Sequence, residues 1–213
     1  MNTMPLFTDR ADAGRQLAAA VAGRADAGAV VLALPRGGVP VAAHVARALG
    51  AALDVLIVRK LGAPGQPEFG IGAIADGAAP QVILNQEAID HLRPPPGYVQ
   101  GEIRRQRDEI ARRHAAYAGG RPPVPVQGRA VVVVDDGAAT GGTAHAALRA
   151  LRQAGAAHLL LALPVASPKA LALLRRHADD VVCLHAPDDF RAVGMYYADF
   201  AQTTDDEVVR LLG

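Results

Sequence analysis

The sequence is poor in the residues that mark secreted, membrane and nucleic-acid-binding proteins. Its single cysteine, Cys183, excludes an internal disulfide, which is typical of a reducing compartment. The 22 basic and 21 acidic residues give a formal net charge of +1, so overall charge does not favour nucleic acid or an anionic membrane as a partner. No uncharged apolar run approaches the ~18 residues of a membrane helix. Asp9, Arg10 and Asp12 stand where a signal peptide needs apolar residues. We expect a soluble, cytoplasmic protein.

Serine and lysine are nearly absent, and this limits the kinds of catalytic site that the chain can form. Ser167 is the only serine and lies in Ala-Ser-Pro-Lys, which excludes a Gly-x-Ser-x-Gly nucleophile elbow. Lysine occurs only at Lys60 and Lys169, so each of them draws attention. The seven histidines show no spacing typical of metal ligands.

Hydrophobic patterning predicts an α/β fold. Short, fully apolar runs rich in β-branched residues predict buried strands at Ala29–Leu34, Leu53–Val58, Val131–Val134, Leu159–Leu163 and Val181–Leu184. Helical spacing or capping residues predict helices after Thr8 or Asp9, over Val41–Leu49, Gly142–Ala154 and Pro168–His177, and from Thr204 to Leu212. Helices that alternate with all-apolar strands predict a doubly wound, mainly parallel five-stranded sheet covered on both faces.

Two irregular stretches, 59–70 and 85–128, are interpreted as insertions on that sheet. Ile71–Ile74 and Gln81–Leu84 flank Asp76-Gly77 and predict a hairpin. The segment 85–128 contains Pro94 to Pro96 and a charged helix from Val99 to about Ala118. We expect a single domain over 1–213 with a small C-terminal hood from about 185 to 213.

The run after the third predicted core strand carries the strongest chemical signal. Asp135 and Asp136 follow Val131–Val134 directly, and residues 137–143 are all small or carry a hydroxyl. Backbone N–H groups of such a loop, at a helix N-terminus, can close around a phosphate. The two carboxylates would repel that phosphate, so they suit the hydroxyls of a phosphorylated sugar, a metal-bound water, or positive charge that develops on the sugar. A structural turn with a helix-capping aspartate explains the pair less well.

The run Val-Val-Val-Val-Asp-Asp-Gly-Ala-Ala-Thr-Gly-Gly-Thr resembles the 5-phosphoribosyl-1-diphosphate (PRPP) motif of type I phosphoribosyltransferases. The resemblance implies that Asp135 and Asp136 contact the ribose hydroxyls, directly or through waters of a Mg²⁺ ion, and that residues 138–143 hold the 5-phosphate. The substrate-binding set is then Asp135, Asp136, Gly137, Ala138, Ala139, Thr140, Gly141, Gly142 and Thr143. Pro35–Gly38, Arg59–Gly62 and Phe190–Phe200 resemble a bacterial branch of the family whose acceptor is poorly defined.

Two further segments are candidates for the leaving diphosphate. Gly37 and Gly38 let the backbone approach an anion and Arg36 supplies charge, although this can also be a tight turn with an exposed arginine. Arg59 and Lys60 end the second predicted strand, where a cation faces the ligand crevice of a parallel sheet; the alternative is a solvated strand end.

Other residues are candidates for catalysis and for binding the acceptor. Gly62–Pro67 lacks periodicity and can form a mobile lid. Glu68 can accept or deliver a proton, or simply pair with Arg59. Phe190, Tyr196 and Tyr197 can form a hood over the acceptor or a small satellite core. The arginine-rich helix after Val99 is interpreted as solvated or dimer-facing.

Taken together, we expect a Mg²⁺-dependent enzyme in which Asp135, Asp136, Lys60, Arg36 and Glu68 are catalytic. It would transfer the 5-phosphoribosyl group of PRPP to a nitrogen of a small, unidentified acceptor, as a possible homodimer. Ala139 stands where hypoxanthine–guanine enzymes of the family have an aspartate, so the sequence disfavours 6-oxopurine salvage. The alternative is a regulatory protein that senses PRPP or a nucleotide without transfer.

Overall fold

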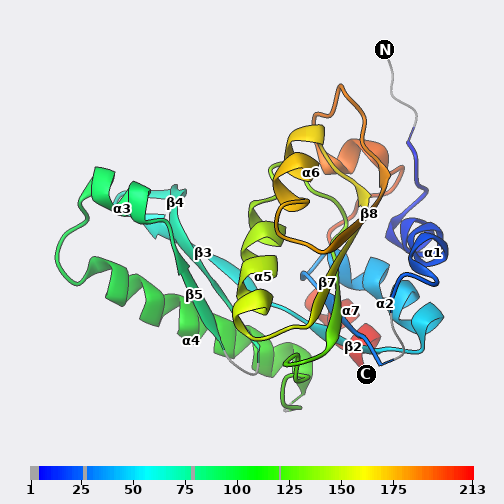
Figure 1. The fold of residues 1–213 in the computed structure, drawn as a ribbon, viewed down its shortest axis with the longest axis horizontal. Helices are drawn as coiled ribbons and strands as arrows, with labels where there is room; N and C mark the ends of the chain where they lie inside the picture. The colour runs from blue at the N-terminus through cyan, green and yellow to red at the C-terminus, as the bar shows by residue number, and fades with distance from the viewer. Residues whose placement is uncertain (1–4, 26–27, 78–79, 120) are drawn as a thin grey trace.

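A five-stranded parallel sheet forms the centre of the molecule, in the order β2-β1-β6-β7-β8 (Figure 1). Its strands are β1 (Val30–Ala33), β2 (Ala52–Val55), β6 (Ala130–Val134), β7 (His158–Val165) and β8 (Asp180–His185). This computed structural model describes residues 5–25, 28–77, 80–119 and 121–213, without the side chains of residues 67, 68 and 118. The predicted doubly wound, parallel architecture is confirmed.

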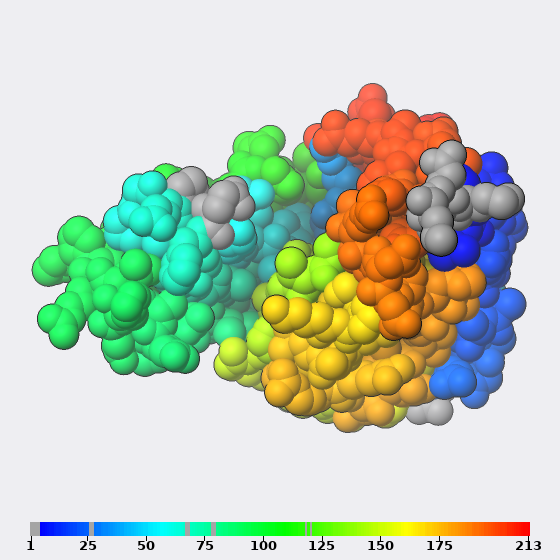
Figure 2. Space-filling view, turned by 90° about the horizontal axis from the view of Figure 1, so that it is seen from above, coloured from blue at the N-terminus to red at the C-terminus, as the bar shows by residue number. Residues whose placement is uncertain are grey.

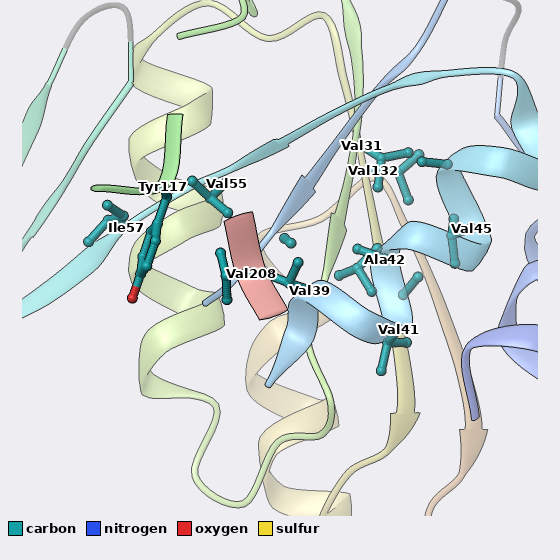
Figure 3. Packing of buried hydrophobic residues seen from close by; sticks show 14 of the residues in the cluster. Val31, Val39, Val41, Ala42, Val45, Val55, Ile57, Tyr117, Val132 and Val208 are labelled. Carbon is teal, nitrogen blue, oxygen red and sulfur yellow. The ribbon is translucent and has the colours of Figure 1, made fainter. Parts of the chain in front are cut away.

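Helices cover both faces of this sheet. They are α1 (Arg10–Val21), α2 (Gly38–Leu49), α5 (Gly142–Gln153), α6 (Pro168–Leu174) and α7 (Asp205–Leu212). The strands are buried on both sides, so alternate residues enter two different cores: Val31 and Val132 pack with α1, α2 and α7, whereas Val30 and Val131 pack with α5 and α6. Figure 3 shows the first of these cores, with Val208 of α7 between α2 and Tyr117.

A second, antiparallel sheet projects from the central one (Figure 1), and its residues belong to a lobe beside the main body of the molecule (Figure 2). It consists of β3 (Val58–Ala63), β4 (Gln66–Ala75) and β5 (Gln81–Leu84), and we call it the flap sheet. Two helices, α3 (Gln86–Leu92) and α4 (Tyr98–Ala118), follow it, and α4 packs along β3 before reaching α7. The predicted hairpin over Gln81–Leu84 is confirmed as β4–β5.

The structure corrects two expectations in this region. Leu53–Val58 is not one strand, because the chain leaves the parallel sheet after Val55 and enters the flap sheet at Val58. The segment 59–70 is not irregular, because β3 and β4 pair along most of it in an antiparallel register with bulges near Gly62. Gly62–Pro67, the segment expected to form a lid, lies at the turn between β3 and β4.

The strand order determines where ligands gather. Chain connections leave β1 and β6 in opposite directions across the sheet, and in doubly wound folds the crevice lies at such a switch point, beyond the carboxyl ends of the strands. The loops after β1 and β6 carry the segments 35–38 and 135–143. None of the helices in the described ranges has the length and apolar character that a bilayer crossing needs.

Candidate active site

The loops after β1 and β6 are packed directly against each other. A Cβ atom on Gly37 would lie 2.0 Å from Asp136 Oδ2, and one on Gly38 would lie 2.8 Å from the carbonyl oxygen of Val134. Because any side chain at position 37 would collide with the Asp136 carboxylate, glycine there allows the two loops to meet. The structure thus brings the predicted diphosphate loop onto the predicted ribose-binding acids.

Arg10, the first residue of α1, holds the Asp136 carboxylate. Its Nε donates to Asp136 Oδ2 at 2.8 Å, and the two side chains are only 12% and 16% exposed. A second guanidinium nitrogen donates to the carbonyl oxygen of Ala201 at 2.7 Å, and the guanidinium carbon lies 3.9 Å from the centre of the Phe200 ring. Arg10 therefore joins the N-terminal helix, the site and the C-terminal tail.

Tyr197 also binds the acidic segment. Its hydroxyl donates to the backbone carbonyl oxygen of Asp136 at 2.6 Å, and its ring packs on Phe7 and Phe200. Burial, followed by the charge of Asp136, raises the pKa of Tyr197. The hydroxyl therefore remains a proton donor to this carbonyl across the physiological range.

The two acids have unusual electrostatic surroundings. Burial, followed by the Asp136 carboxylate, raises the pKa of Asp135 well above its ordinary value. Burial also raises the pKa of Asp136, against the opposing effect of Arg10. Asp135 Oδ1 accepts the N–H of Asp136 at 2.9 Å. A sugar hydroxyl or a cation bound here would stabilise the charged carboxylates and reduce the repulsion between them.

The loop after the acids presents backbone donors at the start of α5. Ala138 is fixed to the sheet, since its N–H donates to the carbonyl oxygen of Val165 at 3.0 Å and its own carbonyl accepts from Ser167 at 2.9 Å. Within the described part of the chain, the amides of Ala139, Thr140, Gly141 and Thr143 donate no hydrogen bond. They stand at the positive end of a 12-residue helix, which favours an anion.

A cavity of about 670 Å³ separates this loop from the flap sheet. Its lining includes Thr140, Gly142 and Thr143 on one side and Lys60 of β3 on the other. Arg59, the preceding residue of the strand, points to the opposite face of the flap sheet, where its Nε donates to Gln106 Oε1 of α4 at 2.9 Å. The structure thus brings Lys60, and not Arg59, to the predicted phosphate loop.

Arg36 lies at a different cavity, of about 130 Å³, which is lined also by Arg112, Arg113, Tyr117 and Asp205. Its guanidinium is 3.5 Å from Asp205 Oδ1. The three cations predicted for the diphosphate are consequently not gathered at one place in this structure.

The aromatic residues of the predicted hood form a satellite core. Tyr196 and Tyr197 are 3% and 4% exposed and pack with Phe7 and Val165. The half-buried Phe190 stacks on Tyr196, with 5.4 Å between the ring centres. The structure therefore favours the core interpretation for the two tyrosines. Glu68 lies in β4, and its side chain is outside the described residues.

Sequence reasoning misses the parts that Arg10 and Tyr197 play in the site. Arg10 is 126 residues from Asp136 and resembles an ordinary first-turn residue of a helix. The aromatic cluster does draw attention to Tyr197, but as a residue that would contact the acceptor.

The fold and site define a class: a doubly wound α/β protein with paired acids and an amide-lined anion loop at the carboxyl edge of its sheet. The phosphoribosyl transferase domain family matches residues 9–200, and the chain belongs to this family. A Mycobacterium tuberculosis protein with the provisional name phosphoribosyl transferase Rv0571c is 46% identical over 209 residues, which are 98% of this chain and 47% of that protein. The chain thus spans about half the length of the curated relatives it matches.

Two solved structures are similar to the chain. The protein TT1426 from Thermus thermophilus is 46% identical, with a TM-score of 0.85 and 97% of each chain covered. A Neisseria gonorrhoeae protein solved with bound ppGpp covers 100% of this chain and 97% of its own, with 13% identity and a TM-score of 0.52, which is a likeness of fold alone.

Proposed function

We propose that this chain transfers the 5-phosphoribosyl group of PRPP to a nitrogen of a small acceptor and releases diphosphate. The contact between the loops after β1 and β6 carries the proposal, because it places Gly37 against Asp136 and Gly38 against Asp135. When the ribose hydroxyls bind the two acids, the 5-phosphate lies at the amides of residues 139–143. The diphosphate then lies toward the loop after β1.

Charge separation in the transition state assigns the roles. As the bond from the anomeric carbon to diphosphate breaks, positive charge grows on the ribose and negative charge on the leaving group. Asp135 and Asp136 stabilise the first; Arg36, Lys60 and the backbone donors of the Gly37–Gly38 loop stabilise the second. Glu68 is the candidate to accept or deliver a proton. Since Arg36 and Lys60 lie at separate cavities, closure of the flap sheet is part of the proposal.

The donor chemistry of the site fits Mg²⁺. Within the described ranges no cluster of three or more histidine, cysteine or carboxylate side chains forms a complete metal cage. Magnesium sites built on one or two carboxylates and completed by water and substrate phosphate need no such cage. Asp135 and Asp136 would hold the ion, through water, and it would neutralise charge on the diphosphate.

The test is turnover with Mg²⁺, PRPP and a panel of nitrogenous bases, measured as diphosphate release together with a base-dependent product. Asp136→Asn should keep the fold and reduce turnover about 10²- to 10³-fold, the usual effect of losing one transition-state contact. Asp108→Asn, an exposed acid of α4, should behave as the parent. Turnover of Asp136→Asn within tenfold of the parent would count against the role of Asp136.

A second candidate function is a PRPP- or nucleotide-sensing regulatory protein without transferase activity. The observation that favours it is the separation of Arg36, Arg59 and Lys60, together with the burial of Tyr196 and Tyr197. Binding of PRPP without base-dependent product across the panel would support this candidate.

A further inference from the structure

The cavity between α5 and the flap sheet is larger than one phosphate group requires. Its volume of about 670 Å³ falls within the ~300–1,000 Å³ of sites that enclose whole small molecules. At ~30 Å³ per water molecule it corresponds to about 20 waters. The cavity therefore has room beyond a phosphate held by the loop at residues 139–143.

The cavity extends along α5, away from the paired acids. Gly142, His145, Ala146 and Arg149 all line it, and their spacing of three, four and seven residues places them on one helix face. Arg149 is about 10 Å from Gly142 along the axis at ~1.5 Å per residue. Asp135, Asp136 and Arg36 do not line this cavity, whereas Thr140, Gly142 and Thr143 of the proposed 5-phosphate loop do.

The charge of the lining selects an anionic ligand. Lys60 and Arg149 are cations, Thr140 and Thr143 supply hydroxyls, and no carboxylate belongs to the described lining. Burial lowers the pKa of His145, and the nearby charges of His177, Arg149 and Arg176 add to that effect.

Arg149 differs from its neighbour Arg152 in having no ion pair within the described ranges. Arg152 is bound to Asp179 at 2.7 Å and lies outside the cavity lining. The His145 ring, by contrast, packs against the His177 ring with 4.3 Å between the ring centres. Arg149 is therefore the cation of this lining that an anionic ligand would satisfy.

We propose that this cavity binds a second anionic group, so that the chain accepts ligands whose ribose 5-phosphate is extended at the phosphate, as in a ribose 5-diphosphate ester. The first phosphate lies on the loop at residues 139–143, and the second lies against Arg149. The inference rests on the proposed binding of a phosphorylated ribose at Asp135 and Asp136.

The experiment compares ribose 5-phosphate with ADP-ribose, which contains the same ribose 5-phosphate joined to a second phosphate and an adenosine. Dissociation constants are measured by titration calorimetry for the parent and for Arg149→Ala, with Arg152→Ala as the matched control. ADP-ribose should bind the parent at least about tenfold more tightly than ribose 5-phosphate. Arg149→Ala should abolish that gain and leave ribose 5-phosphate binding within about twofold, and Arg152→Ala should preserve both affinities.

Each other outcome has a definite meaning. Equal binding of the two ligands by the parent, or a gain that survives in Arg149→Ala because adenosine provides it, overturns the inference and leaves the proposed function intact if PRPP binds. Failure of the parent to bind PRPP as well as both probes overturns the proposed function and the inference together.

Discussion

Arg10 is the residue whose removal should have the largest effect outside the motif. Arg10→Ala leaves the Asp136 carboxylate without its cation and the tail carbonyl of Ala201 without its donor. Removing one partner of a buried ion pair typically costs about 3–5 kcal/mol of stability. We expect Arg10→Ala to lower the free energy of unfolding, measured in urea, by about 3 kcal/mol. Arg15 is an exposed residue of the same helix, and Arg15→Ala should lower the free energy of unfolding by no more than about 1 kcal/mol. Similar losses in both variants would contradict this role of Arg10.

His44 should make folding depend on pH. Burial, followed by the charges of Arg15 and Arg47, lowers the pKa of His44 below its ordinary value of 6.5. The unfolded chain therefore takes up this proton at a higher pH than the folded chain, and protonation near and below pH 6.5 favours unfolding. His44→Gln should become more stable relative to the parent as pH falls from 7.5 to 5.0, measured by urea unfolding at both values. A stability difference that is constant over this range would contradict the assignment.

Individual residues differ in how far the sequence reveals them. Asp135, Asp136 and the loop to Thr143 are identifiable because their chemistry is contiguous in the chain. Arg10 is not, because its role depends on a fold that returns α1 to the carboxyl edge of the sheet. The packing of Gly37 on Asp136 is likewise a tertiary contact between two motifs that the sequence presents separately.

At the scale of elements, α4 is held to the flap sheet by a buried polar network. Arg59 donates to Gln106, and Gln106 donates to the buried Glu102 at 2.9 Å. Gln106→Ala leaves the charged groups of Arg59 and Glu102 without that partner. We therefore expect the free energy of unfolding, measured in urea, to fall by about 1–3 kcal/mol. Arg107→Ala, exposed on the same helix, should change stability by no more than about 0.5 kcal/mol. Equal effects of the two substitutions would show that the network does not stabilise the flap.

The core strands are predictable within a few residues because each is a short apolar run between glycine, proline or polar residues. The junction of β2 and β3 is not, because Leu53–Val58 is apolar at nearly every position although Leu56 and Ile57 cross from one sheet to the other. Pattern reasoning also misses the short helix α3. Its N-cap, Asn85, accepts the N–H of Ala88 at 3.1 Å, and that capping residue was the available signal.

At the scale of the whole molecule, the parallel sheet follows from alternating apolar strands and helices, and the strand order then places two distant loops at one switch point. The projection of the flap sheet could not be derived, since nothing in its sequence specifies its orientation to the central sheet. That orientation forms the cavity shared by Lys60 and α5. The separation of Arg36 from Lys60 is a property of the same arrangement.

The most direct measurement is the affinity of the parent and Gly37→Ala for PRPP in the presence of Mg²⁺, by titration calorimetry. The added methyl group would lie 2.0 Å from Asp136 Oδ2 and so displace that carboxylate. The control is Gly101→Ala in α4, where the nearest atom would be 4.0 Å away. We predict that the parent and Gly101→Ala bind PRPP equally and that Gly37→Ala, still folded, binds at least about tenfold more weakly. Equal affinities in all three proteins, or no binding by the parent, would contradict the assignment of this site.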